Sequence, residues 1–304
     1  METQARGGPG SGDLTESKNR ARNSTPMIWR TASRSFDLTH RGLIMGVLNV
    51  TPDSFSDGGK YFDPEDAIAR GLAMVADGAD VLDIGGESTR PGAVPVEAEE
   101  ELRRILPVIE GLRARSGVAI SIDTMKARVA AAGMAAGADI INDISGLQHD
   151  PAMARVAAET GAGLVLMHMR GTPRTMQERP AYANVVEEVR ERLMEAYAEA
   201  VAAGVDAECI ALDPGIGFGK TLEHNLALLR ALPEFGIHDR PVLLGVSRKS
   251  FLGKLLDKSD PLAREAPTAA LTAWSRQCGV RILRVHAVRE NAEALRMMEA
   301  VLGG

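Results

Sequence analysis

Residues 43–50 have the sequence Leu-Ile-Met-Gly-Val-Leu-Asn-Val, a short apolar run with one polar residue near its end. Seven more runs of this kind occur along the chain, and a segment with helical features follows each of them. These runs are Val81–Ile84, Ala119–Ile122, Ile140–Ile144, Gly163–Met167, Cys209–Leu212, Val242–Val246 and Arg281–Val285. Strand, turn and helix repeated eight times predict an α/β protein with a closed (β/α)8 TIM barrel, in preference to a doubly wound open sheet.

Polar side chains lie in or directly after these runs. The carboxyl ends of barrel strands converge on one mouth, where the active sites of such proteins lie. We therefore predict one pocket that carries carboxylates, amides and basic groups together. The residues concerned are Asn49, Asp83, Asp123, Asn142, His168, Asp213, Ser247, Lys249, Arg284 and His286.

The helices and the chain ends are predicted from local signals. The pairs Asp63-Pro64 and Asp150-Pro151 are typical of helix starts, with an N-cap followed by proline in the first turn. Ile28–Trp29 and Phe36–Leu38 are predicted to form a hairpin that closes the barrel bottom. We expect a disordered tail over residues 1–26, which are rich in small and polar residues, and a single barrel domain over residues 27–304. The other helices are expected over 96–114, 126–136, 183–203, 222–231, 263–278 and 290–301.

The composition excludes several classes of protein. A net charge of −6 over 304 residues argues against general nucleic-acid binding, because no basic excess can neutralise phosphates. Cys209 and Cys278 are too few for a disulfide framework and suit a reducing compartment. No apolar stretch approaches the roughly 20 residues that cross a bilayer, and the N-terminus lacks the apolar core of a secretory signal. These features predict a cytoplasmic protein without a membrane or nucleic-acid partner.

Three loops carry unusual residue combinations. The loop over residues 49–59 is longer than a minimal strand–helix connection and offers several side-chain oxygens. The loop over 85–92 places Thr89 and Arg90 beside glycines, whose backbone can approach a ligand closely. The loop over 245–250 brings two adjacent cations to the mouth of an acidic protein, which favours binding of an anion or a carbonyl group. Each loop alone is equally compatible with a solvated turn.

Together, these loops resemble those of the dihydropteroate synthase family. The matching motifs are Met-Gly-Val-Leu-Asn-Val-Thr-Pro-Asp-Ser-Phe-Ser-Asp-Gly-Gly at 45–59, Asp-Ile-Gly-Gly-Glu-Ser-Thr-Arg-Pro-Gly at 83–92, Ser-Ile-Asp-Thr at 121–124, Ile-Asn-Asp-Ile at 141–144, Leu-Met-His-Met at 166–169, Asp-Pro-Gly-Ile-Gly-Phe-Gly-Lys at 213–220, Ser-Arg-Lys-Ser at 247–250 and Arg-Val-His at 284–286. They occur in the expected order at the expected strand ends, and the resemblance extends from about Ile28 to the C-terminus.

The resemblance implies condensation of 6-hydroxymethyl-7,8-dihydropterin diphosphate with 4-aminobenzoate, giving 7,8-dihydropteroate and diphosphate with the help of Mg²⁺. It also implies sulfonamide binding in the aminobenzoate site, a homodimer, and a metal contact at Asn49. The aminobenzoate contacts that it implies are Phe55, Thr89, Pro91, Phe218 and Ser247.

The residue chemistry agrees with this reaction. A pterin offers N–H donors that ionised carboxylates can accept, and Asn142 adds a mixed partner. We expect Asp123, Asn142, Asp213 and Lys249 to bind the pterin, with Asp83 and Met167 lining its pocket. Charge-assisted hydrogen bonds of this kind contribute about 1.5–3 kcal/mol each.

The anionic oxygens of a diphosphate are stabilised by basic side chains and by a metal ion. We expect the diphosphate near Asn49, Thr89, Arg90, Arg284 and His286. Mg²⁺ on a diphosphate keeps several waters and needs few protein ligands. We expect carboxylates around the heterocycle and cations around the phosphates, which favours an SN1-like loss of diphosphate before the amine attacks. Asp123, Lys249, Asn49, Arg284 and His286 are the predicted catalytic residues.

Other functions remain possible at this point. A pterin-dependent methyltransferase would share Asp123, Asn142 and Asp213, but would not need the loops at 51–55, 88–91 and 247–250. A pterin-binding homologue without turnover would be expected to have lost loop or cationic residues, and none of those named above is missing. A Schiff base on Lys249 is disfavoured, because no phosphate-binding glycine loop follows the seventh strand.

Overall fold

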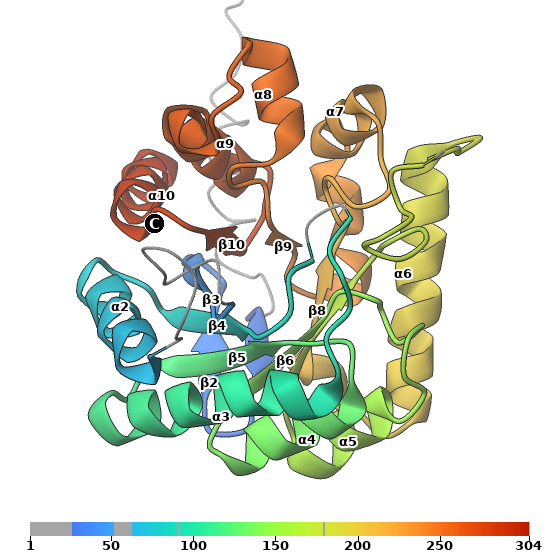
Figure 1. The fold of residues 1–304 in the computed structure, drawn as a ribbon. Coiled ribbons are helices and arrows are strands. Elements are labelled where there is room, and N and C mark those ends of the chain that lie inside the picture. The colour runs from blue at the N-terminus through green and yellow to red at the C-terminus, as the bar shows by residue number, and fades with distance from the viewer. Residues whose placement is uncertain (1–25, 52–62, 90–91, 179, 304) are drawn as a thin grey trace, which may run out of the picture.

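The computed structural model describes residues 26–51, 63–89, 92–178 and 180–303. Within these ranges, eight parallel strands lie at the centre and helices surround them (Figure 1). The predicted TIM barrel is therefore confirmed. Its strands are β3 (Leu43–Asn49), β4 (Val81–Gly85), β5 (Ala119–Asp123), β6 (Ile140–Asp143), β7 (Gly163–Met167), β8 (Ile210–Asp213), β9 (Leu243–Leu244) and β10 (Ile282–Val285).

The strand order shows how the barrel closes. The strands are hydrogen-bonded in the order β8-β7-β6-β5-β4-β3-β10-β9, so the last strand returns beside the first. Between β8 and β9, an isolated parallel bridge joins Leu212 to Val242, and the Leu212 amide donates to the Pro241 carbonyl at 3.0 Å. The barrel is nearly closed, with its weakest pairing at the two-residue strand β9.

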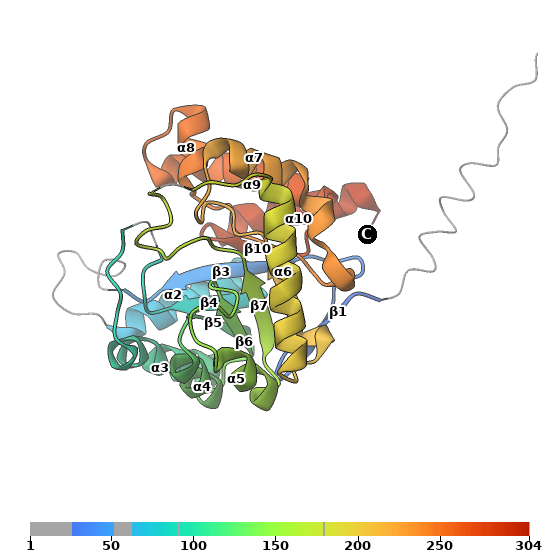
Figure 2. The ribbon, with the colours of Figure 1, turned by 90° about the vertical axis from the view of Figure 1, so that its right-hand side faces the viewer.

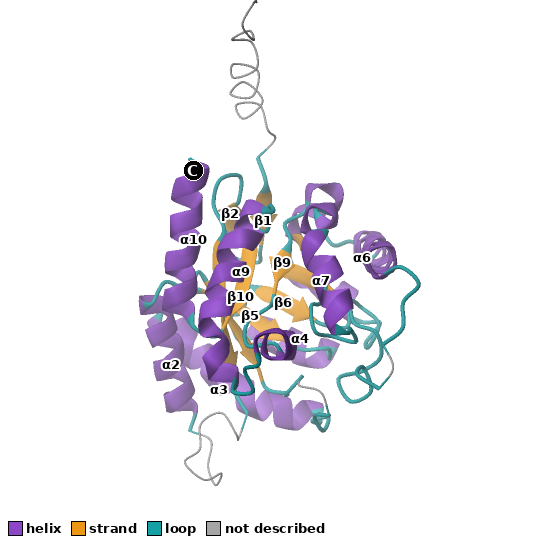
Figure 3. Ribbon diagram, turned by 90° about the horizontal axis from the view of Figure 1, so that it is seen from above, coloured by secondary structure: helices purple, strands orange, loops and turns teal. Residues whose placement is uncertain are grey.

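The helices form an outer layer around the strands (Figures 2 and 3). They are α2 (Pro64–Ala76), α3 (Ala98–Arg115), α4 (Ala127–Ala135), α5 (Met153–Thr160), α6 (Val185–Ala202), α7 (Leu222–Arg230), α8 (Ser250–Leu256), α9 (Glu265–Gln277) and α10 (Val288–Leu302). None of the helices in the described part of the chain combines the length and apolarity that a membrane crossing requires.

One predicted helix start is confirmed and another is wrong. Asp63 is the N-cap of α2, and its side chain accepts a hydrogen bond from the Glu65 amide at 2.9 Å. Asp150 is not an N-cap, because α5 begins only at Met153 after a turn. The Asp150 carboxylate instead accepts from the amides of Ala152 and Ala127, at 3.0 and 2.9 Å. It therefore ties the start of α5 to the start of α4.

The bottom of the barrel is closed by the predicted hairpin. Strand β1 (Ile28–Arg30) pairs antiparallel with β2 (Ser35–Asp37). Trp29 is fully buried among the inward-facing apolar residues of the strands, and its indole N–H donates to the Cys209 carbonyl at 2.9 Å. Burying this large side chain fills the lower end of the barrel, so a ligand must enter from the opposite mouth.

Strand alternation directs the polar residues into that mouth. Side chains two positions apart on a strand share one face. Val81, Ile140 and Ala211 belong to the apolar cluster inside the lower barrel. Asp83, Asn142 and Asp213 stand two residues further along the same strands, and therefore point inward one layer higher.

Candidate active site

Two carboxylates and one guanidinium form the centre of the site. The Arg284 Nε atom of β10 donates to Asp83 Oδ2 of β4 at 2.6 Å, and Nη2 donates to Asp123 Oδ2 of β5 at 2.6 Å. Asn142 of β6 donates through Nδ2 to the same Asp83 oxygen at 3.1 Å. Four strand ends that are far apart in sequence thus meet in one network, as the sequence predicted.

The network differs from the expected separation of charges. Arg284 was expected to face the diphosphate, yet it lies between the two carboxylates. The reason is electrostatic, since two neighbouring buried carboxylates require a cation between them. Asp83 Oδ1, Asp123 Oδ1 and the hydroxyl of Ser121 are buried without a hydrogen-bond partner among the described residues. These oxygens are suited to accept N–H groups from a bound molecule.

Burial controls the acidity of the carboxylates. It raises the pKa of Asp123 to about 7, with Asp83 adding to the rise and Arg284 opposing it. Burial likewise raises the pKa of Asp213 to about 6, against the lowering effects of the Gly215 amide and nearby Lys249. The Gly215 amide donates to Asp213 Oδ1 at 2.7 Å. Both carboxyls therefore change protonation state close to neutral pH.

Lys249 lies between these groups and an aromatic ring. Burial lowers the pKa of Lys249 to about 7, and Arg284 lowers it further while Asp213 and Asp123 oppose the shift. The Lys249 Nζ atom lies 3.8 Å from the centroid of the Phe218 ring. A cation over the face of a ring is stabilised by the ring's electron density. The predicted pterin and aminobenzoate contacts are therefore neighbours.

Lys220 is a site residue that the sequence did not single out. It is 3% exposed, and its Nζ atom lies 3.0 Å from His168 Nδ1 and 2.9 Å from the Phe218 carbonyl. Burial lowers the pKa of His168 to about 2, with Lys220 adding to the effect. His168 is therefore a neutral, buried residue that supports the site. The only signal for Lys220 was its place in the Gly-Phe-Gly-Lys motif.

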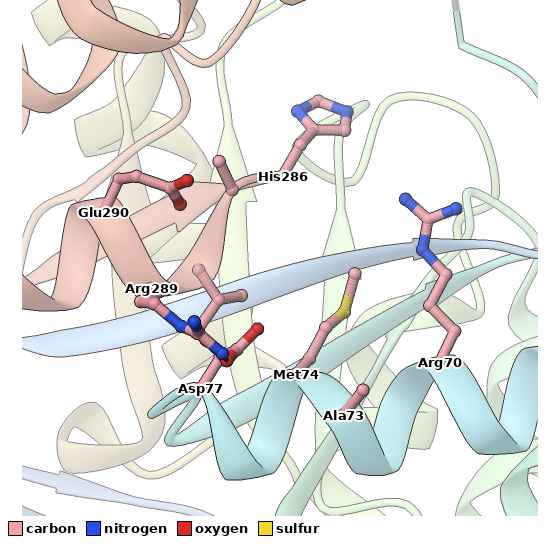
Figure 4. Close-up of a pocket in the computed structure, with 9 residues that line it drawn as sticks. Arg70, Ala73, Met74, Asp77, His286, Arg289 and Glu290 are labelled. Carbon is pink, nitrogen blue, oxygen red and sulfur yellow. Dashed lines mark hydrogen bonds and ion pairs between the residues drawn. The ribbon is translucent and has the colours of Figure 1, made fainter.

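Ser247 and His286 meet at the ends of β9 and β10. The Ser247 hydroxyl lies 3.0 Å from His286 Nδ1 and accepts from the His286 amide at 3.2 Å. His286 also borders a pocket of about 310 Å³ between α2 and the start of α10. Figure 4 shows the side chains of Arg70 and His286 rising on the same side of this pocket, while Arg289 and Asp77 lie at its other end.

The remaining predicted residues fall into two groups. Asn49 is the last residue of β3, Thr89 lies in the loop after β4, and Met167 is buried beside Phe218 in a small apolar cluster. Phe55, Arg90 and Pro91 lie outside the described residues. Over the described ranges, no group of three or more His, Cys, Asp or Glu side chains could bind a metal ion.

Buried acceptor oxygens lie beside a lysine and an arginine at the carboxyl end of a TIM barrel. This is where the active sites of such barrels lie, and the oxygens suit a small molecule that carries N–H donors. The family model described as "Pterin binding enzyme" matches residues 45–286. The chain therefore belongs to the pterin-binding enzymes.

Similar proteins narrow this assignment to the dihydropteroate synthase family. The chain is 50% identical over 265 residues to dihydropteroate synthase of Mycobacterium leprae, covering 85% of this chain and 93% of that protein. It is 47% identical to the enzyme of Escherichia coli K12, covering 88% and 94%.

Solved structures agree with this assignment. Xanthomonas albilineans dihydropteroate synthase with 4-aminobenzoic acid matches with a TM-score of 0.86 and 43% identity, over 92% of this chain and 100% of that one. The same enzyme in complex with 7,8-dihydropteroate matches with a TM-score of 0.81 and 41% identity, over 90% and 98%.

Proposed function

We propose that this protein is a dihydropteroate synthase that joins a pterin methylene carbon to the amine of 4-aminobenzoate. The observation that carries the proposal is the pair of buried oxygens on Asp83 and Asp123 that have no hydrogen-bond partner among the described residues. Asn142 and Asp213 are buried at the same mouth of the barrel, and the charge of Lys249 acts on Asp123 and Asp213. An aminopyrimidinone edge presents N–H donors to carboxylates and an acceptor to lysine. Met167 packs beneath this ring.

The reaction proceeds by cleavage of the carbon–oxygen bond before the new bond forms. The electron pair leaves with diphosphate, and the pterin methylene carries positive charge. Asp83 and Asp123, in their ionised forms, stabilise that charge through the ring. The aromatic amine then donates its lone pair to the methylene carbon and loses one proton.

The leaving group departs toward the side of the mouth where His286 lies. His286, Asn49, Thr89 and Arg90 supply polar and cationic contacts for its oxygens, and Arg284 contributes its charge from within the carboxylate network. The pocket beside His286 provides space for a terminal phosphate. This arrangement separates the phosphates from the pterin ring.

Mg²⁺ fits this site as an ion carried by the diphosphate. The described residues offer Asn49 as a single amide ligand and no carboxylate cage. Mg²⁺ normally binds in this way, with substrate phosphates and water completing its coordination. When bound, it would neutralise charge on the leaving diphosphate.

The aminobenzoate ring is expected against Phe218, with Ser247 near its carboxylate and Phe55, Thr89 and Pro91 completing the site. Replacing Phe218 by alanine should weaken aminobenzoate binding about tenfold, because an aromatic side chain contributes about 1.5 kcal/mol or more by contact. Pterin affinity should change less than twofold by the same reasoning. Calorimetric titration of each ligand measures both values, and equal losses for the two would contradict the assignment.

Pterin affinity should fall as the pH is lowered from about 8 to about 5. Only ionised carboxylates accept two N–H bonds, and burial raises the pKa of Asp123 to about 7 and of Asp213 to about 6. Protonation across this range therefore removes acceptors. Titration with a pterin that lacks phosphate measures the effect without phosphate ionisation. A constant affinity over this range, with the fold intact by circular dichroism, would refute the assigned roles.

Diphosphate release tests the function directly. Wild-type protein is given the pterin diphosphate and Mg²⁺, with and without 4-aminobenzoate. We expect fast release that depends on aminobenzoate, together with dihydropteroate and a trace of pterin alcohol formed when water captures the cation. Pterin binding without release would indicate a non-catalytic homologue, and no pterin binding would overturn the proposal. The homodimer and the cytoplasmic location stay predictions.

A further inference from the structure

A buried ion cluster lies beside the active site, and the reaction described above does not use it. Lys126, which follows β5, bonds through Nζ to Glu101 of α3 at 2.6 Å and also to Glu87 in the β4 loop. Glu101 is 1% exposed, and the side chains of Lys126 and Glu87 are 19% and 13% exposed. One ammonium group thus connects a loop, a strand end and a helix.

This cluster is not explained as a source of stability alone. Two carboxylates share one ammonium group, so the cluster keeps a net negative charge. Glu101 Oε1 is also buried without a hydrogen-bond partner among the described residues. Burying charges in this way costs free energy that apolar packing would not. An ionic cluster of this kind fixes one geometry, since its bonds are directional while apolar contacts are not.

The geometry that it fixes is the path of the β4 loop. A Cβ atom at Gly86 would lie 2.8 Å from Ile105 Cγ2, so the loop backbone presses directly on α3. Arg104 of the same helix donates to the Gly86 carbonyl at 2.7 Å. Glu87, the next residue, is fixed by Lys126, and Thr89 follows two residues later.

The cluster also adjoins the pterin carboxylates. Lys126 stands three residues after Asp123 on the same strand-to-helix connection, and the charge of Glu101 contributes to the raised pKa of Asp123. The loop that carries Thr89 and the strand that carries Asp123 are therefore joined through one side chain. Moving the Lys126 ammonium would disturb the loop more than the strand, because β5 is fixed by its neighbours β4 and β6.

We propose that Lys126 is a positioning residue that fixes the β4 loop, through Glu87 and Glu101, in the conformation that binds aminobenzoate. This role rests on the proposed function, since Thr89 is assigned to that substrate. Lys126 itself need not touch either substrate. The pterin contacts on Asn142 and Asp213 do not depend on it.

The test compares Lys126→Met with wild type in steady-state assays. We expect the KM for aminobenzoate to rise about tenfold, because a small displacement of a group that binds the substrate can weaken binding by this amount. Affinity for a phosphate-free pterin should stay within about twofold. Lys126→Arg, which retains the charge and reach, should restore most of the aminobenzoate KM. An equal loss of affinity for the phosphate-free pterin, or an unchanged KM for aminobenzoate, would overturn the proposal.

A matched control and a second readout separate this proposal from the proposed function. Arg113→Met removes a comparable ion pair with Asp139, 2.6 Å long, at the opposite end of the barrel. It should lower the melting temperature without changing either KM. Amide hydrogen exchange over residues 86–89 should accelerate in Lys126→Met and not in Arg113→Met, in the absence of substrates. Unchanged exchange would reject the positioning role even if wild type proved inactive as a synthase.

Discussion

Replacing Asp123 by asparagine should lower kcat/KM for the pterin diphosphate by about 10²-fold to 10⁴-fold, because two charge-assisted contacts contribute about 1.5–3 kcal/mol each. The Asp123 carboxylate accepts from Arg284 on one oxygen and has a second buried oxygen without a partner. An asparagine amide would direct N–H donors at a pterin edge that also donates. It would also leave Asp83 as the one carboxylate bonded directly to Arg284 among the described residues, with Asp213 contributing charge from further away.

The Asp123→Asn substitution should slow the cleavage of the bond to diphosphate as well as weaken pterin binding. Asp123 stabilises positive charge that grows on the pterin as diphosphate leaves, so the transition state loses more than the ground state. Single-turnover measurements with saturating substrates should therefore show a slower bond cleavage, and equilibrium titration should show weaker pterin binding. An effect on binding alone would contradict the electrostatic role in cleavage.

Asp143→Asn is the matched control for this substitution. Asp143 lies on β6 next to Asn142, but it faces away from the mouth and accepts from the Ser145 and Leu147 amides, both at 2.8 Å. The same change of carboxylate to amide should lower thermal stability there and leave pterin affinity within about twofold. A similar loss of activity in both variants would indicate a general disturbance of the barrel.

The inward ring of polar residues could be predicted because strand geometry alone determines it. Each polar residue follows an apolar run, and the period of two places it on the inner face. Asp83, Asp123, Asn142 and Asp213 met at the mouth for this reason. The hairpin around Trp29 was predicted on other grounds, from two short apolar runs, Ile28–Trp29 and Phe36–Leu38, that flank a polar stretch.

The pairing of charges could not be predicted from the sequence. Arg284 bonds Asp83 and Asp123 across 201 and 161 residues, and only the closed barrel brings these strands together. The same holds for Lys126 with Glu87 and Glu101, which the sequence showed as separate charged residues. Asp150 is a smaller example of the same limit. Its carboxylate accepts a hydrogen bond from the Ala127 amide at the start of α4, a contact that the sequence does not show, and α5 begins later than predicted.

Replacing Lys249 by methionine should lower kcat/KM by about 10²-fold, since the pterin loses one charged donor and the site loses a cation. Methionine keeps most of the packing volume against Phe218. The substitution should also shift the acid limb of the pH profile toward higher pH. Lys249 lowers the pKa of both Asp123 and Asp213, so without it each carboxyl protonates at a higher pH.

Lys254→Met provides the comparison, because Lys254 is exposed on α8 and close in sequence. It should leave the rate and the pH profile unchanged. A difference between the two variants would then be due to the position of Lys249 in the site, and not to the loss of one positive charge from the protein. The shift in pH dependence is the decisive measurement. A merely structural lysine would lower activity equally at every pH, whereas a lysine that keeps the pterin carboxylates ionised must lower it most below neutrality. A Lys249→Met enzyme with an unshifted acid limb would show that the carboxylates and this lysine act independently.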